Sequence, residues 1–179
     1  MPIRAALDGA RLRSLAATVA LAATAAGFGL PSAALAVAGD PGLDSEERSV
    51  CRQINAYRAS KGLAALRLSA PLTRAADWMS LDMASHDTFD HIDSRGRDFD
   101  ERIPAFGYRG RTMAENLAGG KGEATATFRQ LHSSPSHRRD MLRAKLTIVG
   151  VGRAYAADSM LGWYWVTTFG AGRERAAAC

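Results

Sequence analysis

The chain has 179 residues, with 23 basic and 18 acidic side chains and a net charge of +5. This length suits one domain preceded by an export segment. The basic residues are scattered among acidic ones, with no basic run and no aromatic platform beside arginines, which argues against nucleic-acid binding.

The first 38 residues have the form of a secretory signal peptide. Arginines lie near the start, and the uncharged stretch from Ser14 to Gly39 is rich in Ala and Leu. It ends in Ala34-Leu35-Ala36-Val37-Ala38, which offers A-x-A cleavage sites. An uncleaved anchor is the alternative, because the stretch is long enough to span a bilayer, but its weak hydrophobicity favours cleavage. We therefore expect an exported protein with no stable membrane insertion.

The expected domain plan follows from this cleavage. We predict a signal peptide over residues 1–38, an N-terminal tail over 39–45 and one domain over 46–179. Cleavage removes three Arg and one Asp, which lowers the net charge from +5 to +3. A protein of this kind lies in the periplasm or outside the cell.

Two helices are predicted in the first half of the exported chain. The first follows Asp44, an N-cap with Glu47 three residues on, and ends at Lys61-Gly62. The second follows Ser69 and has Pro71 in its first turn. Its buried stripe comprises Leu72, Ala75, Ala76, Met79 and Met83.

Short helices and strands alternate in the rest of the chain. Asp98 caps a short helix through Ile103, and Ser134 caps a helical turn over 137–143. The other predicted elements are a strand at 112–117, a helix at 123–131 and strands at 146–155 and 163–169. The short connection between the last two strands predicts an antiparallel sheet covered by helices, an α+β fold. Trp163 and Trp165 should face one layer and Tyr164 the other.

Cys51 and Cys179 are the two cysteines of the chain, and both follow the leader. Such a pair commonly forms a disulfide in an oxidising compartment. A bridge closing so long a loop is worth about 4–5 kcal/mol in the chain-entropy model. The alternative is a buried Cys51 and a free Cys179; we favour the bridge, which ties the first helix to the C-terminus.

The chain's four histidines form two pairs with the same gap: His86 and His91, then His132 and His137. Five residues turn a helix by about 500°, so the partners within a pair point roughly 140° apart. A site must therefore join one member of each pair. Glu101 and Glu115 lie between the pairs, and imidazoles with carboxylates are typical ligands of divalent metals.

Four segments in order carry a wider pattern: Phe89-Asp90-His91, Asp100-Glu101-Arg102-Ile103, Ala114-Glu115-Asn116-Leu117-Ala118-Gly119 and Ser134-Pro135-Ser136-His137-Arg138-Arg139-Asp140-Met141-Leu142. With the Trp-Tyr-Trp strand that follows, they resemble the CAP superfamily. That superfamily comprises cysteine-rich secretory proteins, antigen 5 and pathogenesis-related 1 proteins, and has many short bacterial members. The resemblance covers residues 46–170.

The resemblance implies a three-layer α-β-α sandwich with a central antiparallel sheet. It places the family's cavity tetrad on His91, Glu101, Glu115 and His137. It also implies a divalent metal at the two histidines, with Zn²⁺ as the candidate, and in some members a sterol or lipid ligand. Two imidazoles alone would bind such a metal weakly. The alternative is a polar core in which these residues hydrogen-bond one another.

Two functions are open at this point. The first is a non-catalytic module whose cleft binds a divalent metal and a lipid, glycan or protein ligand of the cell envelope. The second is a metal-assisted hydrolase acting on peptidoglycan or its peptides, with Glu101 or Glu115 as the general base. The sequence has no substrate-pocket signature for the hydrolase, so we favour binding.

Overall fold

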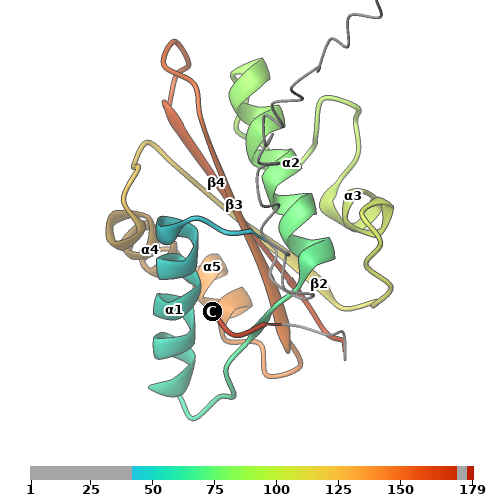
Figure 1. Ribbon diagram of the computed structural model, residues 1–179, viewed down its shortest axis with the longest axis vertical. Coiled ribbons are helices and arrows are strands. Elements are labelled where there is room, and N and C mark those ends of the chain that lie inside the picture. The colour runs from blue at the N-terminus through green and yellow to red at the C-terminus, as the bar shows by residue number, and fades with distance from the viewer. Residues whose placement is uncertain (1–41, 173–176) are drawn as a thin grey trace, which may run out of the picture. The chain divides into compact units, whose positions relative to one another are not determined.

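The computed structural model describes residues 42–172 and 177–179. The expected signal peptide and residues 39–41 of the expected tail lie outside these residues. Figure 1 shows the elements, which in chain order are α1 (Ser45–Ala59), β1 (Arg67–Leu68), α2 (Ala70–His86), α3 (Phe99–Ala105), β2 (Met113–Gly119), α4 (Ala124–Ser133), α5 (Pro135–Met141), β3 (Ile148–Tyr155) and β4 (Trp163–Gly170). Within the described part of the chain, no helix is long and apolar enough to cross a membrane.

The two long helices begin where the sequence predicts. The Asp44 carboxylate accepts the backbone N–H groups of Glu46 and Glu47, both at 2.9 Å, and the Glu47 carboxylate accepts the N–H of Asp44 at 2.7 Å. This reciprocal capping box satisfies donors that have no partner inside the helix. Ser69 caps α2 through its hydroxyl oxygen, which accepts the N–H of Leu72.

Three shorter elements differ from the prediction. Helix α3 continues through Pro104 to Ala105, because Pro104 lies one residue from the helix end, where the hydrogen bond it removes costs little. Helix α5 begins at Pro135 rather than at His137, directly after the Ser134 cap. Strand β1 was not predicted, since two residues show no periodicity.

The sheet has the order β1-β3-β4-β2. Strands β3 and β4 pair antiparallel, and so do β2 and β4, as expected. Strand β1 pairs parallel to β3, with Arg67 opposite Ile148, so the sheet is mixed rather than wholly antiparallel. The prediction of a wholly antiparallel sheet was wrong at this one edge, where the missed strand β1 lies. Strand β2 forms the other edge.

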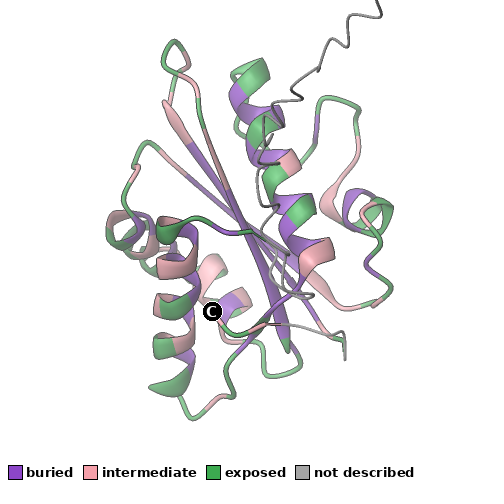
Figure 2. Ribbon diagram, in the orientation of Figure 1, coloured by how far each residue is buried: buried purple, intermediate pink, exposed green. Residues whose placement is uncertain are grey.

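Helices cover both faces of the sheet, which gives the three layers of the expected sandwich (Figure 1). Figure 2 shows the sheet as the buried centre of the molecule. Trp165 packs with α1 and α4, together with the partly buried Trp163, whereas Tyr164 packs with α2. This confirms the predicted division of the three aromatic residues between the two faces.

Two glycines let α2 lie directly on β3. A Cβ atom at Gly150 would be 2.2 Å from the carbonyl carbon of Leu72, and one at Gly152 would be 2.4 Å from the backbone nitrogen of Asp77. On the opposite face of the same strand, Val149 and Val151 are buried against the layer that contains α1. The alternating Val-Gly pattern therefore fits a strand that contacts side chains on one face and a helix backbone on the other.

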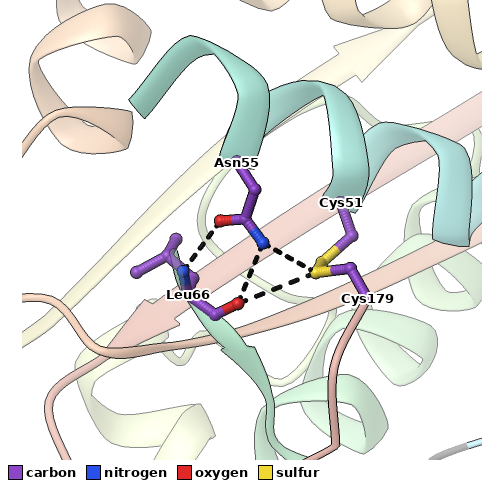
Figure 3. Close-up of a disulfide and its surroundings, with 4 residues drawn as sticks. All are labelled: Cys51, Asn55, Leu66 and Cys179. Carbon is purple, nitrogen blue, oxygen red and sulfur yellow. Dashed lines mark hydrogen bonds between the residues drawn. A yellow bond between two sulfur atoms is a disulfide. The ribbon is translucent and has the colours of Figure 1, made fainter. Parts of the chain in front are cut away.

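The predicted disulfide is confirmed (Figure 3). Cys51 in α1 is bonded to Cys179, with 5.7 Å between their Cα atoms. The Asn55 side chain lies beside it, accepts the N–H of Leu66 at 2.7 Å and donates to the Leu66 carbonyl at 2.9 Å. The bridge and this amide together attach the C-terminus and the segment before β1 to the first helix.

We expect Gly150→Ala to lower the free energy of unfolding by about 1–3 kcal/mol, because the new methyl group meets the α2 backbone rather than a movable side chain. Urea unfolding followed by circular dichroism measures this effect. An unchanged unfolding midpoint would show that α2 does not lie so closely on β3.

We expect Asp77→Asn to stabilise the protein at pH 8 and to leave its stability unchanged at pH 4. Partial burial, together with the negative charges of Glu47 and Asp44, raises the pKa of the Asp77 carboxyl from 3.8 to about 7. The unfolded chain loses this proton near pH 4, so the wild-type protein loses stability as pH rises from about 4 to 7. Because part of the Asp77 residue remains in contact with water, the gain should be about 1 kcal/mol. Equal effects at both pH values in urea unfolding would contradict this expectation.

Candidate functional site

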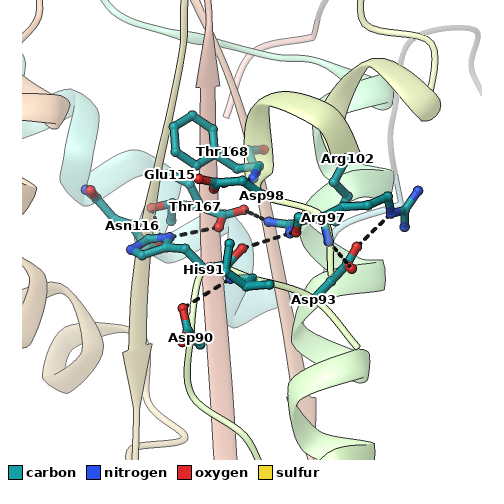
Figure 4. Close-up of polar contacts among 12 residues, drawn as sticks. Asp90, His91, Asp93, Arg97, Asp98, Arg102, Glu115, Asn116, Thr167 and Thr168 are labelled. Atoms are coloured by element: carbon teal, nitrogen blue, oxygen red, sulfur yellow. Dashed lines mark hydrogen bonds and ion pairs between the residues drawn. The ribbon is translucent and has the colours of Figure 1, made fainter. Parts of the chain in front are cut away.

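A buried carboxylate on the edge strand lies at the centre of the site (Figure 4). Glu115 of β2 is 5% exposed, and its Oε1 lies 3.0 Å from Nδ1 of His91. His91 comes from the loop between α2 and α3, and its side chain remains 42% exposed. The site therefore joins a partly exposed imidazole to a carboxylate that is removed from solvent.

Arg102 of α3 balances the charge of this carboxylate. Its side chain is fully buried, and its Nη2 lies 2.5 Å from Oε2 of Glu115. Its Nη1 donates to the backbone carbonyl of His91 at 3.1 Å. Arg102 therefore pairs with Glu115 and also fixes the loop that carries the imidazole (Figure 4).

Two aspartates hold the same loop. The Asp93 carboxylate accepts the N–H groups of Arg95 and Arg97 and pairs with the Arg97 guanidinium, each at 2.9 Å. Burial opposes ionisation of Asp93, but these hydrogen bonds outweigh it and hold its pKa below the usual range. Asp82 of α2 accepts the N–H and hydroxyl of Ser94. The loop is thus held by specific contacts on both sides of its turn.

His137 approaches from the other side of the edge strand. Neighbouring residues of a strand face opposite layers, so Glu115 faces α3 while Asn116 faces α5. Asn116 donates through Nδ2 to the backbone carbonyl of His137 at 3.2 Å. Nδ1 of His137 and Oδ1 of Asn116 are buried and have no hydrogen-bond partner among the described residues. These two atoms are therefore hydrogen-bonding groups beside the site that the described residues leave unsatisfied.

The two histidines differ in their pKa. The hydrogen bond that His91 donates to Glu115 raises the pKa of His91, and the opposing effect of burial is smaller. Burial lowers the pKa of His137, and the charge of His91 lowers it further. The cationic form is therefore favoured at His91 and the neutral form at His137.

Glu101 does not join this group in the structure. It is exposed on α3, and no hydrogen bond or ion pair links it to His91, Glu115 or His137 in residues 42–172. Successive residues of a helix point about 100° apart, so a buried Arg102 places Glu101 toward solvent. Of the four residues that the sequence suggests, the structure joins His91 to Glu115, and Asn116, the neighbour of Glu115, contacts the backbone of His137.

Arg102 is a member of the site that the local sequence does not predict. The sequence gives little indication that Arg102 is buried, because a charged residue in a short polar helix is usually exposed. The partner Glu115 lies in another element, and nothing in the local sequence relates the two.

The residues present fit a metal only in part. Among the described residues, no group of three or more His, Cys, Asp or Glu side chains is arranged to hold a metal ion. Each oxygen of Glu115 already has a partner. Two imidazoles remain as ligands, with Nε2 of His91 and Nδ1 of His137 free of hydrogen bonds from the described part of the chain.

Comparisons with known proteins agree with this architecture. Residues 51–169 match the model of the cysteine-rich secretory protein family, CAP. An SCP-domain extracellular protein from Bacillus anthracis is 20% identical, with a TM-score of 0.63 over 71% of this chain and 40% of that chain. An outer surface protein from Borrelia burgdorferi is 21% identical, with a TM-score of 0.64 over 73% of this chain and 97% of that chain.

A cysteine-rich secretory protein from Staphylococcus aureus gives a TM-score of 0.57 at 18% identity, over 71% of this chain and 38% of that chain. This chain therefore spans less than half the length of the Bacillus and Staphylococcus proteins. No curated protein matches the sequence. At these identities, the structural likenesses establish the fold.

We expect Arg102→Leu to lower the free energy of unfolding by about 3–5 kcal/mol, because it leaves the Glu115 carboxylate buried without a cation. The double variant Arg102→Leu/Glu115→Leu should recover most of this loss, since it removes both charges. Urea unfolding of the four proteins of this cycle gives the coupling energy. Additive losses would mean that the two side chains do not form the buried pair.

Proposed function

The chain belongs to the cysteine-rich secretory protein (CAP) family, and we propose that it is an exported binding domain whose His91 and His137 hold a divalent metal weakly. The observation that carries the proposal is the buried Nδ1 of His137, which has no partner in the described part of the chain. A ring nitrogen in this situation gains a partner when a cation or a ligand donor occupies the space beside it.

Other contacts support a metal at these two imidazoles. Glu115 accepts from His91 Nδ1, the arrangement in which a carboxylate orients an imidazole and leaves Nε2 to coordinate. Burial favours neutral His137, which is the form that ligates metals. When bound, Zn²⁺ would offer open coordination positions to donor atoms of a ligand. With two protein ligands the affinity should be low.

The geometry favours binding over hydrolysis. A metal-assisted hydrolase needs a carboxylate free to take a proton from the attacking water. The Glu115 oxygens are engaged by Arg102 and His91, and Glu101 faces solvent. Neither glutamate is therefore both unengaged and close to the two histidines, which remain as groups that bind.

Several observations support export and an envelope ligand. The first 38 residues have signal-peptide form, and Cys51–Cys179 is typical of an oxidising compartment. Structural relatives include proteins described as extracellular or outer-surface. We accordingly place the protein in the periplasm or outside the cell, where a lipid, glycan or protein of the envelope is its available ligand.

Calorimetric titration of the exported protein with ZnCl₂ tests the metal site. We expect His91→Ala and His137→Ala each to weaken binding at least tenfold, because each removes one of two ligands. His132→Ala is the matched control, since its ring packs on Tyr57 at 4.7 Å instead of on the site. Equal weakening by all three variants, or no effect of the first two, would overturn the proposed metal site.

Incubation of the Zn²⁺-treated protein with purified cell-wall sacculi separates binding from hydrolysis. We expect no metal-dependent release of soluble fragments. Release that disappears in Glu115→Gln, in a protein that remains folded by circular dichroism, would contradict the binding proposal and support a hydrolase.

A further inference from the structure

A polar hollow lies outside the His91–Glu115 site. It has a volume of about 250 Å³ and lies between the second half of α2 and the turn that follows His91. The residues that line it include Trp78, Asp82, Ser85, His86, Ser94 and Arg95. Neither the proposed metal site nor the packing of the sheet uses this hollow.

Asp82 supplies a fixed acceptor in this hollow. The residue is 8% exposed, and its carboxylate accepts the Ser94 N–H at 2.8 Å and the Ser94 hydroxyl at 2.5 Å. A carboxylate has about four acceptor positions, so these two bonds leave capacity for hydroxyl groups of a ligand. Because Ser94 holds the carboxylate in place, little side-chain entropy is lost when a ligand binds.

Arg95 supplies a cation with no carboxylate partner within the described residues. Its guanidinium lies 5.4 Å from the centre of the Trp78 ring. Arg97 lies at 5.2 Å from the same ring, but Asp93 pairs with it at 2.9 Å. The two arginines therefore differ: Arg97 is neutralised, whereas Arg95 keeps its donors available to an anionic group.

His86 and Trp78 are further side chains that line the hollow. His86 Nδ1 lies 2.9 Å from the backbone carbonyl of Asp82, so Nδ1 donates and Nε2 of the neutral ring is an acceptor. The Ser85 hydroxyl lines the same hollow. Trp78 is half-buried, and its ring, over which the guanidinium groups of Arg95 and Arg97 lie, borders the hollow. The hollow is therefore large enough for a small ligand. It is lined by acceptors for the ligand's hydroxyl groups, by an aromatic side chain and by one available cation.

We propose that this hollow binds an acidic sugar, a pyranose that carries a carboxylate. Arg95 pairs with the carboxylate of the sugar, and Asp82 and His86 accept its hydroxyl groups. The buried Asp82 charge disfavours a compact polyanion and selects a ligand whose negative charge is separated from its hydroxyls. This site does not depend on the proposed metal at His91 and His137.

Proton–nitrogen correlation spectra of the protein test the proposal with two matched pairs of probes. N-acetylmuramic acid is compared with N-acetylglucosamine, and glucuronic acid with glucose; in each pair the first sugar carries a carboxylate that the second lacks. We expect the acidic sugars to shift the signals of Ser94, Arg95 and the Trp78 indole, with at least tenfold tighter binding than their neutral partners. The pair that binds better distinguishes a peptidoglycan source from a uronic-acid polymer.

Arg95→Gln should abolish the preference for the acidic sugars. Arg109→Gln is the control, because it removes the same charge from an exposed position outside the hollow. His91→Ala should leave sugar binding unchanged, so failure of the metal site and failure of this site are distinguishable. Three outcomes would each overturn the proposal. They are equal effects of the two arginine variants, equal binding of lactate alone, and no signal shifts at about 50 mM sugar. The last outcome corresponds to a binding free energy weaker than about 2 kcal/mol.

Discussion

The buried pair between Arg102 and Glu115 is the interaction on which the site depends. A carboxylate removed from water is costly unless a cation and hydrogen-bond donors compensate its charge. Arg102 supplies the cation, and His91 supplies the second donor. Because Arg102 also binds the backbone carbonyl of His91, the same guanidinium fixes both the charge and the position of the imidazole. His91 lies in a surface loop, but these contacts hold it in a fixed position, as packing holds a core residue.

The fold explains why these residues meet. Strand β2 is the edge of the sheet, so side chains on its two faces lie close to the same exposed rim. Glu115 faces the layer of α3, and Asn116 contacts the backbone of His137 from the other layer. The close approach of α2 to Gly150 and Gly152 sets where the loop bearing His91 begins, and the disulfide fixes α1 on the opposite face. The site therefore forms where the helix layers on the two faces of the sheet meet at its edge strand, β2.

Much of this architecture could be predicted from local sequence, because local rules govern it. Asp44 and Ser69 cap their helices through bonds to neighbours three residues away, and the alternation of Trp163, Tyr164 and Trp165 follows the pleat of one strand. Arg102 escaped prediction because its partners lie in other elements. The outward position of Glu101 has the same cause, since the rotation of α3 is set by where Arg102 is buried. Strand β1 is defined by its pairing to β3 and not by its own two residues.

We infer that Glu115 and Arg102 hold His91 so that its proton affinity differs from that of His137. Histidine ring titrations of the metal-free protein by NMR test it most directly. We predict that the pKa of His91 lies above the usual value of 6.5 and that of His137 below it, and that Glu115→Gln lowers the pKa of His91. If both rings titrate together near 6.5, or if Glu115→Gln leaves His91 unchanged in a folded protein, the account of the site is wrong.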